Sequence, residues 1–129
     1  STETLKKGDA FMRLGDSYFA LKQFWPALES YNQALSLQRR DADLAEFHKA
    51  LAYGQLGRID AKKTSLQKLL DQYPSSTLRD DAYYELGNTL LNANNETEAM
   101  LAYEALTKEY RMSSLVVKFI KTAGKTKPR

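Results

Sequence analysis

The sequence predicts an all-α protein built from one helical hairpin that repeats along the chain. Seven residues of the first hairpin recur 72 positions later with similar chemistry. They are Phe11, Leu14, Gly15, Tyr18, Ala27, Tyr31 and Ala34, followed by Tyr83, Leu86, Gly87, Leu90, Ala99, Tyr103 and Leu106. A less regular middle copy contains Ala50, Tyr53, Gly57, Leu66, Leu69 and Pro74. Repetition with a period of about 20 to 50 residues is typical of solenoid proteins, which generally bind partners and seldom catalyse reactions.

The composition also favours helices. The 129 residues are 43% hydrophobic and 27% charged, they include many strong helix formers, and only three are proline. This length suits a single domain with an ordinary core. Cysteine is absent, which excludes disulfides, thiolate zinc sites and cysteine nucleophiles.

The net charge of +3 is unevenly distributed. From Tyr110 onward the chain has six basic side chains and no acidic one, which leaves 13 basic and 16 acidic side chains before it. No apolar run approaches the roughly 18 residues of a membrane span. The polar start, residues 1–4, has neither an initiator Met nor a signal peptide, so we expect a piece of a larger multi-repeat protein.

Caps and apolar spacing predict the first hairpin. Thr2 or Thr4 can cap a first helix that runs to about residue 21, with apolar residues mostly three or four positions apart. Pro26 lies where a second helix begins, a position that tolerates proline because first-turn amides lack an intrahelical partner. This second helix is predicted to end near residue 37.

Turn residues delimit the helices that follow. A third helix, over about 42–56, ends at Gly57, which can adopt the left-handed conformation found after helices. A fourth, over about 59–73, stops at Pro74, and the serines after this proline can cap a fifth helix over about 77–91.

The last part of the chain predicts two more helices. The asparagine pair 94–95 indicates a turn, and Glu96 and Glu98 then favour the start of a sixth helix that reaches about residue 110. The serine pair 113–114 can cap a seventh helix over about 115–122. The residues after Gly124 are predicted to be a frayed end.

Small residues are predicted to bring the two helices of each hairpin close together. Gly15 with Ala27, and Gly87 with Ala99, supply a small residue on each side of the crossing. Three tyrosines are expected to fill the space between neighbouring hairpins, namely Tyr18, Tyr31 and Tyr103. Because one hairpin cannot bury its apolar face alone, about three must stack, and three are present.

The pattern of Gly15, Tyr18, Ala27, Tyr31 and Ala34 resembles the tetratricopeptide repeat, and the resemblance covers about residues 8–113. It implies a right-handed α-α superhelix in a single domain over 1–123, followed by a basic disordered tail at 124–129. The three hairpins would lie at about 8–41, 43–76 and 80–113, with a C-terminal capping helix at about 114–123. The remaining residues of the repeat framework are Tyr53, Gly57, Pro74, Gly87, Ala99 and Tyr103.

The second repeat departs from the family pattern, and the segment after residue 114 has two interpretations. In the second repeat, Glu46 and Lys49 occupy positions where the family has large apolar residues, and Lys62 replaces the usual alanine. The apolar run after residue 114 is either a cap over the third repeat or the stump of a fourth. A stump would expose an apolar face and leave self-association open.

The turns at residues 73–76 and 110–114 resemble those of tetratricopeptide proteins of the bacterial envelope, such as the Tol–Pal-associated periplasmic factor. This resemblance implies a bacterial protein and favours the periplasm or cell envelope over the cytoplasm, although the residues themselves leave the compartment undecided.

Catalysis and cofactor binding are not expected. His48 is the only histidine, so no second His or Cys can complete a transition-metal site. The acidic pairs Asp80-Asp81 and Glu96/Glu98 lie at predicted helix starts, where the helix dipole accounts for them. We therefore expect no enzyme, no cofactor and no metal centre.

The family resemblance implies a concave groove lined by the first helix of each hairpin, where an extended peptide commonly binds. The matching groove residues are Met12, Asp16, Phe19, Phe47, His48, Asp81, Tyr84, Glu85, Asn88 and Asn92. On the same face we expect Asp9, Arg13, Leu44, Leu51, Gln55 and Leu91.

The charges of this face predict the kind of partner. Asp16, Asp81 and Glu85 would repel a carboxylate, which excludes the C-terminal tails of chaperones as ligands. A neutral or basic protein segment with an aromatic or aliphatic anchor fits better, its backbone held by Asn88 and Asn92. Alternatively, these residues only solvate an inner face, and the module is an architectural spacer or self-associates. The basic C-terminal tail lacks interleaved aromatic residues, so nucleic-acid binding is not expected.

Overall fold

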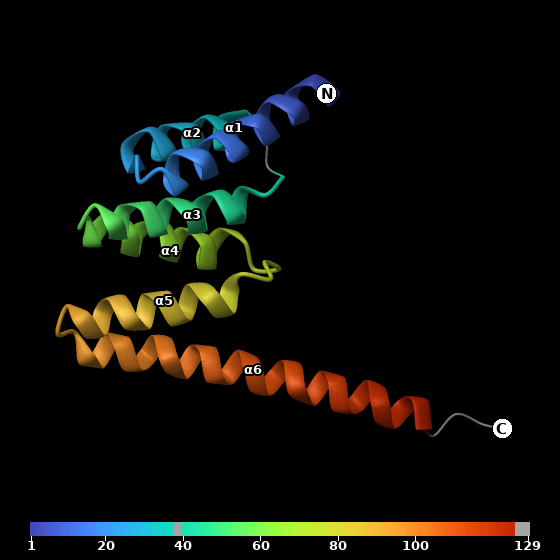
Figure 1. Cartoon of the computed structure of the whole chain (residues 1–129). Helices are drawn as coiled ribbons and strands as arrows, with labels where there is room; N and C mark the ends of the chain where they lie inside the picture. The colour runs from blue at the N-terminus through green and yellow to red at the C-terminus, as the bar shows by residue number, and fades with distance from the viewer. Residues whose placement is uncertain (38–39, 126–129) are drawn as a thin grey trace. The chain divides into compact units, whose positions relative to one another are not determined.

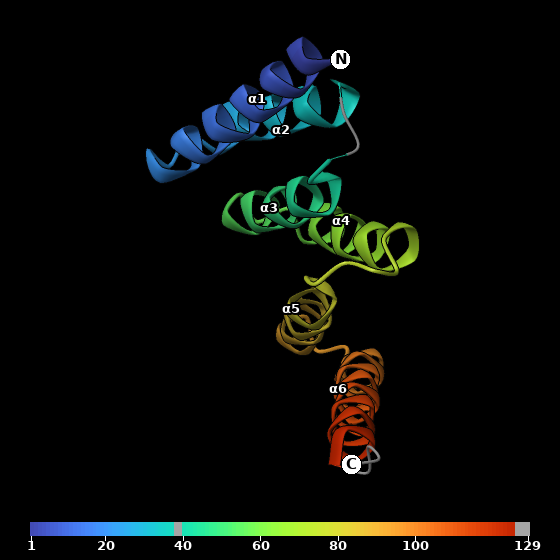
Figure 2. The same cartoon turned by 90° about the vertical axis from the view of Figure 1, so that its right-hand side faces the viewer.

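A computed structural model of the chain describes residues 1–37 and 40–125. Within these ranges the chain forms six α-helices and no strand (Figure 1). The helices are α1 (Thr2–Ala20), α2 (Phe24–Leu37), α3 (Ala42–Gln55), α4 (Ile59–Gln72), α5 (Arg79–Asn92) and α6 (Glu96–Lys125). Consecutive helices pair as three antiparallel hairpins, α1–α2, α3–α4 and α5–α6, as both overall views show (Figures 1 and 2). The predicted all-α repeat fold is confirmed.

The chain divides into two compact units, Ser1–Ala82 and Tyr83–Arg129, and each is described by itself. In the first unit, α3 packs against α2, so the first two hairpins share one core. The second unit consists of α6 and most of α5. None of the helices in the described ranges is long and apolar enough to cross a membrane. A single domain over residues 1–123 stays a prediction.

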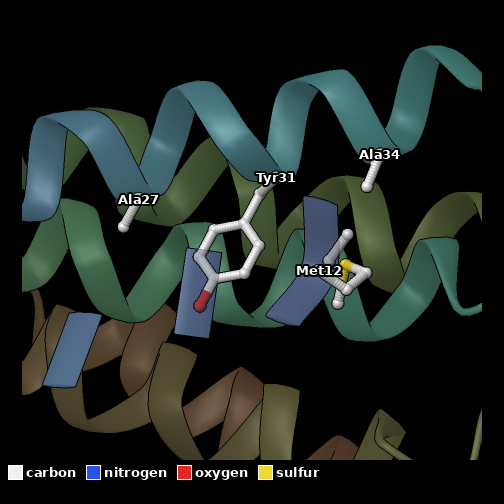
Figure 3. Close-up of a cluster of buried hydrophobic side chains, with 5 residues drawn as sticks. Met12, Ala27, Tyr31 and Ala34 are labelled. Carbon is white, nitrogen blue, oxygen red and sulfur yellow. The ribbon is translucent and has the colours of Figure 1, made fainter. Parts of the chain in front are cut away.

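The core of the first unit lies where α1, α2 and α3 meet. Ala27, Tyr31 and Ala34 project from one side of α2, and Met12 of α1 lies beside the tyrosine ring (Figure 3). Ala45 of α3 completes the cluster. All five side chains are buried, so this junction removes a continuous apolar surface from water.

A tyrosine ring occupies the space that glycine leaves in the first and third hairpins. A Cβ atom added at Gly15 would lie 2.7 Å from Cδ1 and 2.9 Å from Cζ of Tyr31. At Gly87 it would lie 2.8 Å from the same two atoms of Tyr103. The predicted crossing of small against small residues is therefore incomplete: Ala27 and Ala99 are buried as expected, but the glycines make room for an aromatic ring.

The second hairpin solves the same packing problem with different residues. Ala50 and Leu66 stand 35 positions after Gly15 and Tyr31, and both are completely buried. A leucine side chain is smaller than a tyrosine ring, which leaves space for the alanine Cβ. The combined volume is thus kept roughly constant between repeats, as close packing requires.

The three hairpins share one type of turn. Lys22, Gly57 and Asn94 each adopt the left-handed conformation, with φ of 60°, 71° and 61°. In each turn the next amide donates a hydrogen bond to the carbonyl five residues back, which satisfies one of the last carbonyls of the helix. These bonds join Gln23 to Tyr18 at 2.8 Å, Arg58 to Tyr53 at 2.9 Å and Asn95 to Leu90 at 2.9 Å. The turn predicted at Gly57 is therefore present.

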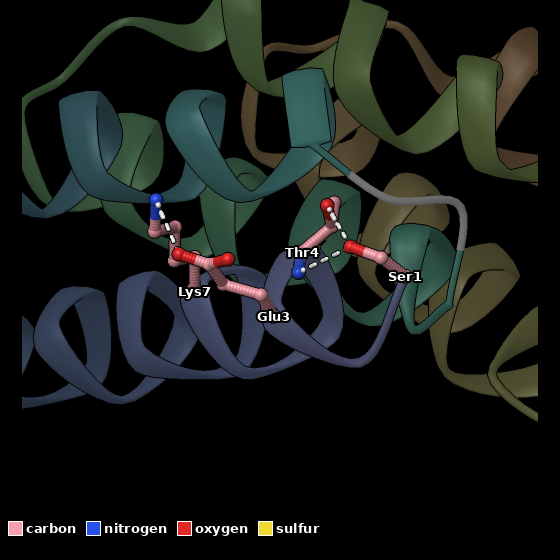
Figure 4. A network of polar contacts seen from close by, with 4 residues as sticks. All are labelled: Ser1, Glu3, Thr4 and Lys7. Carbon is pink, nitrogen blue, oxygen red and sulfur yellow. Dashed lines mark hydrogen bonds and ion pairs between the residues drawn. The ribbon is translucent and has the colours of Figure 1, made fainter.

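The N-cap of α1 differs from the predicted one. The side chain of Ser1 accepts a hydrogen bond from the backbone amide of Thr4 at 3.2 Å and lies 2.8 Å from its hydroxyl (Figure 4). Glu3 and Lys7 form an ion pair at 3.3 Å along the same turn. Thr2 and Thr4 are both inside the helix, so neither can be the cap, because a cap oxygen must precede the amides that it accepts from.

The predicted seventh helix is not separate, because α6 runs without interruption from Glu96 to Lys125. At the end of α4, Pro74 lacks an amide and stops the helix. In the third repeat the equivalent position is Arg111, which has a backbone amide and can continue a helix. The sequence around it contains no glycine that would end the helix. The serine pair 113–114 therefore lies inside a helix. The predicted capping helix at 114–123 is wrong as a separate element, and residues 126–129 of the predicted tail lie outside the described residues.

In the second repeat, a lysine of α3 and a lysine of α4 both approach the buried carboxylate of Glu46. Glu46 is only 1% exposed, and its carboxylate lies 3.4 Å from Nζ of Lys68 and 3.8 Å from Nζ of Lys49. Burial lowers the pKa of Lys49, although the charge of Glu46 acts in the opposite direction. An ion-pair cluster thus takes the place of the large apolar residues that the family has here.

Replacing Gly15 by Ala tests the contact between glycine and tyrosine. We expect a loss of about 1–3 kcal/mol in the free energy of unfolding, because the methyl group would overlap the buried ring of Tyr31. Urea denaturation followed by circular dichroism measures the change.

Gly54→Ala is the matched control, since its Cβ would meet only the flexible side chain of Lys62, and we expect a neutral or stabilising effect. The double variant Gly15→Ala/Tyr31→Leu copies the second hairpin and should be less destabilised than the sum of its single changes. Equal losses at Gly15 and Gly54 would contradict the packing argument.

Replacing Lys22 by Gly tests the left-handed turn of the first hairpin. Lys22 has a positive φ that glycine adopts without steric cost, so we expect a gain of about 0.5–1 kcal/mol in unfolding free energy. Lys22→Ala removes the same charge without relieving the conformation and should give no such gain. Thermal or urea unfolding of both variants decides the matter.

Candidate functional site

A small hollow opens on the first unit, where three helices contribute side chains. Asp16, Phe19 and Ala20 come from α1, Tyr31 comes from α2, and His48 and Leu51 come from α3. The hollow has a volume of about 190 Å³. Its walls are mainly apolar, and the carboxylate of Asp16 is the one negative charge among its lining residues. Apolar walls with a single placed polar group are also found in ligand sites, although those are generally larger.

The hydroxyl of Tyr31 holds the carboxylate of Asp16 in place. Tyr31 is 1% exposed, and its buried hydroxyl donates a hydrogen bond of 2.7 Å to Oδ1 of Asp16. Burial, and secondarily the hydrogen bond and charge of Asp16, raise the pKa of Tyr31 well above its usual range. The phenol therefore stays protonated and remains a hydrogen-bond donor to Asp16.

His48 brings α3 to the same carboxylate. Its Nδ1 lies 2.9 Å from Oδ1 of Asp16, although the two groups lack hydrogen-bond alignment. The contact is therefore electrostatic, and it is attractive when the imidazole is protonated. The rings of His48 and Tyr31 also meet edge to face, with centroids 5.5 Å apart at 63°. Together these contacts hold Asp16 and His48 in a defined arrangement between α1 and α3.

Asp16 nevertheless remains accessible. Its side chain is 52% exposed, and both contacts described above involve Oδ1. A second charged pair, Arg13 with Asp9 at 2.8 Å, lies one turn earlier on α1 and is also exposed. The carboxylate of Asp16 can thus receive a hydrogen-bond donor from solvent while one oxygen stays anchored.

Phe19 forms the apolar wall next to Asp16. It is half-buried, and its ring meets Phe24 of α2 edge to face, with centroids 5.1 Å apart at 77°. Leu51 of α3 also lines the hollow. A ligand side chain that enters here would contact aromatic and aliphatic surface beside a negative charge.

The third hairpin repeats the contact between tyrosine and the groove residue. The hydroxyl of Tyr103 donates a hydrogen bond of 2.5 Å to Oδ1 of Asn88. Tyr31 and Tyr103 each follow their acceptor by 15 positions, and both acceptors stand directly after the glycine that the ring covers. All four residues are among the predicted groove or framework residues, but the bonds between them were not predicted. The shared spacing of 15 residues is the signal that could have revealed them.

The structure brings together only some of the predicted groove residues. Asp16, Phe19 and His48 line the hollow, whereas Phe47 is half-buried and does not. Met12 is 6% exposed and belongs to the core, because the small side chains of Ala34 and Ala45 leave a space that it fills. Assigning Met12 to the groove was therefore wrong.

The predicted groove residues of α5 share one face of that helix. Asp81, Glu85, Asn88 and Asn92 follow one another at intervals of four, three and four residues. Asp81 and Asn92 are exposed, and Glu85 and Asn88 are half-buried. Tyr84 is exposed beside them. Asn88 uses Oδ1 to accept from Tyr103, so its Nδ2 group is the part that can donate to a ligand.

Two tetratricopeptide repeat models match the chain, one over residues 8–41 and the other over residues 44–76 and 81–111. The chain therefore belongs to the tetratricopeptide repeat family. No curated protein matches it, so no relative supports the likeness to bacterial envelope proteins. Tetratricopeptide repeats generally mediate protein–protein interactions and are generally not enzymes.

Replacing Tyr31 by Phe tests the anchoring of Asp16. We expect a loss of about 1 kcal/mol in unfolding free energy at neutral pH, because water can partly replace the hydroxyl at the half-exposed carboxylate. The unfolded chain ionises Tyr31 near pH 10, whereas the folded chain holds it neutral. The stability that Tyr31 contributes is therefore complete below about pH 10 and is lost as the pH rises further.

Urea denaturation of the parent and of Tyr31→Phe between about pH 7 and pH 11 measures this effect. The difference in unfolding free energy between the two proteins should shrink at the alkaline end. Tyr84→Phe, at an exposed position of α5, is the control and should follow the parent. A constant difference across the range would contradict the assignment.

Proposed function

We propose that this chain is a non-catalytic protein-interaction module that binds an extended segment of a partner protein at the hollow of its first unit. The observation that carries the proposal is the carboxylate of Asp16. One of its oxygens is held by Tyr31, yet its side chain is 52% exposed at the mouth of a largely apolar hollow. A preformed charge of this kind favours binding because little conformational freedom is lost when the ligand arrives.

The negative charge and apolar walls of the hollow favour a particular kind of partner segment. A Lys or Arg side chain, or a backbone amide, can donate to Asp16, and an adjacent aliphatic or aromatic residue can contact Phe19 and Leu51. A C-terminal carboxylate would meet Asp16 as a like charge without a compensating cation. The proposed ligand is therefore a neutral or basic segment, not the carboxylate tail of a chaperone.

The face of α5 is proposed as a further contact surface of the same kind. Asn88 presents a donor group, Asn92 is exposed four residues later, and Tyr84 offers an exposed aromatic ring. Amide side chains can satisfy the backbone groups of an extended peptide in both directions. This surface lies in the second unit and is tested by its own variants.

Peptides selected from a random phage-displayed library against the whole chain provide the ligand for the test. We expect the selected peptides to carry Lys or Arg next to a Leu, Phe or similar residue. Isothermal titration of one such peptide should show that Asp16→Asn weakens binding by about tenfold, because a charge-assisted contact becomes a neutral one. Phe19→Ala should weaken binding by a similar factor.

Asp9→Asn is the matched control, since Asp9 lies on the same helix and is exposed but does not line the hollow. Its affinity should equal that of the parent. Asn88→Ala and Tyr84→Ala test the face of α5 in the same titration. If the selected peptides are acidic, or if Asp16→Asn and Phe19→Ala bind as the parent does, the hollow is not the binding site.

A further inference from the structure

One face of α6 is open, whereas the equivalent face of α2 in the first hairpin is covered by α3. In the first unit α3 packs against this face of α2, and Leu28 is 3% exposed and Tyr31 1% exposed. Met100 stands 72 residues after Leu28, and it is 53% exposed. A hollow of about 310 Å³ lies here, and its lining includes Leu91, Met100, Tyr103 and Thr107.

No later segment within residues 108–125 returns to cover this face. After α2 the chain turns back into α3, but after Thr107 it continues in the same helix to Lys125. In Figure 1, α6 correspondingly runs on well past the start of α5. The described part of this helix hairpin therefore leaves the hollow open to solvent or to a partner.

The open face continues along α6 and changes its charge. Glu96, Met100, Tyr103, Thr107, Tyr110 and Lys121 all fall on one side of the helix, because their spacings alternate between four and three residues or are multiples of that pattern. Met100 and Tyr110 are largely exposed. The side thus begins with an acid, passes through Met100, two tyrosines and the hydroxyl residues Thr107 and Ser114, and ends with a base.

We propose that the occupant is a second copy of this chain, and that two α6 helices pair antiparallel through this side. In an antiparallel pair, Thr107 of one copy lies opposite Tyr110 of the other, and Met100 comes under the second copy's C-terminal half. The same alignment sets Glu96 opposite Lys121 of the second copy at both ends. At the edge of the interface between the two helices, the same alignment sets Glu104 opposite Arg111 of the second copy. Each attraction occurs twice because the pairing has twofold symmetry.

In an alternative, head-to-tail association, α1 of one copy would cover the open face of α6 of the next copy. The residues of α1 fit this role less well. The residues of α3 that meet the core or hollow beside α2 include Leu44, Ala45 and His48. At the positions 35 residues earlier, α1 carries Asp9, Ala10 and Arg13. Asp9 and Arg13 form an exposed ion pair, so this side of α1 would bury two charges against Met100 and Leu91. A closed dimer is therefore favoured over an open chain of copies. The proposed pairing is separate from the peptide site of the first unit.

A charge-reversal experiment on Glu104 and Arg111 tests the pairing. Sedimentation velocity of the parent over micromolar to submillimolar concentrations should show a monomer–dimer equilibrium. Glu104→Lys and Arg111→Glu should each raise the dimer dissociation constant by about tenfold, because two attractive pairs per dimer become repulsive. Glu96 is left unchanged because its reversal would also disturb the start of α6.

Mixing the two single variants provides the decisive measurement. An antiparallel pair of one Glu104→Lys chain and one Arg111→Glu chain has opposite charges at both edge positions, so the equimolar mixture should dimerise about as well as the parent. A mixture that associates no better than its separate components would overturn the proposal. So would a parent that stays monomeric, or one that forms chains longer than a dimer.

A second pair of variants tests the apolar part of the surface. Met100→Lys places a charge in the open face and should abolish the dimer. Leu101→Lys is the matched control, because Leu101 is similarly exposed but lies on another side of α6, and it should dimerise as the parent does. Circular dichroism establishes that each variant keeps the helical content of the parent. Equal loss of the dimer in both variants would contradict the proposed surface.

Discussion

In the first and third hairpins, a glycine on one helix lets a tyrosine ring of the next helix lie directly on its backbone. This contact sets how closely the two helices approach, since any Cβ at Gly15 would overlap the ring of Tyr31. The ring also reaches across the hairpin, so its hydroxyl meets Asp16, the residue next to the glycine. One buried side chain thereby determines the packing of the hairpin and the position of a polar group at its surface.

The same contact connects the core with the candidate binding site. Tyr31 belongs to the apolar cluster with Met12 and Ala45, while its hydroxyl bonds to an accessible carboxylate. Because His48 approaches the same oxygen from α3, the carboxylate also joins two consecutive hairpins. A ligand at Asp16 would therefore act on groups that are already part of the junction between α1 and α3, so these groups would be preorganised for binding.

The helices at the two ends of the described chain differ in the faces that they present. In the first unit, one side of α3 packs against α2. The equivalent side of α1 carries the ion pair of Asp9 and Arg13, which is exposed to solvent. The corresponding end of the third hairpin exposes Met100 and Leu91 instead. The first hairpin thus carries charges on this side, whereas the third carries an apolar surface that the proposed pairing would cover.

The sequence by itself determined the three hairpins, the left-handed turn at Gly57 and the break at Pro74, and it identified Asp16 and Asn88 as candidate groove residues. These features depend on the local backbone or on a repeated spacing, both of which can be seen in a linear chain. Only the tertiary structure decided that Tyr31 covers Gly15, that Met12 is buried and that residues 113–114 continue a helix. Serine suits both a helix cap and a helix interior, and a methionine one turn before Asp16 could face either the groove or the core. Such choices depend on the volume left by side chains distant in the sequence, here Ala34 and Ala45, which no local pattern contains.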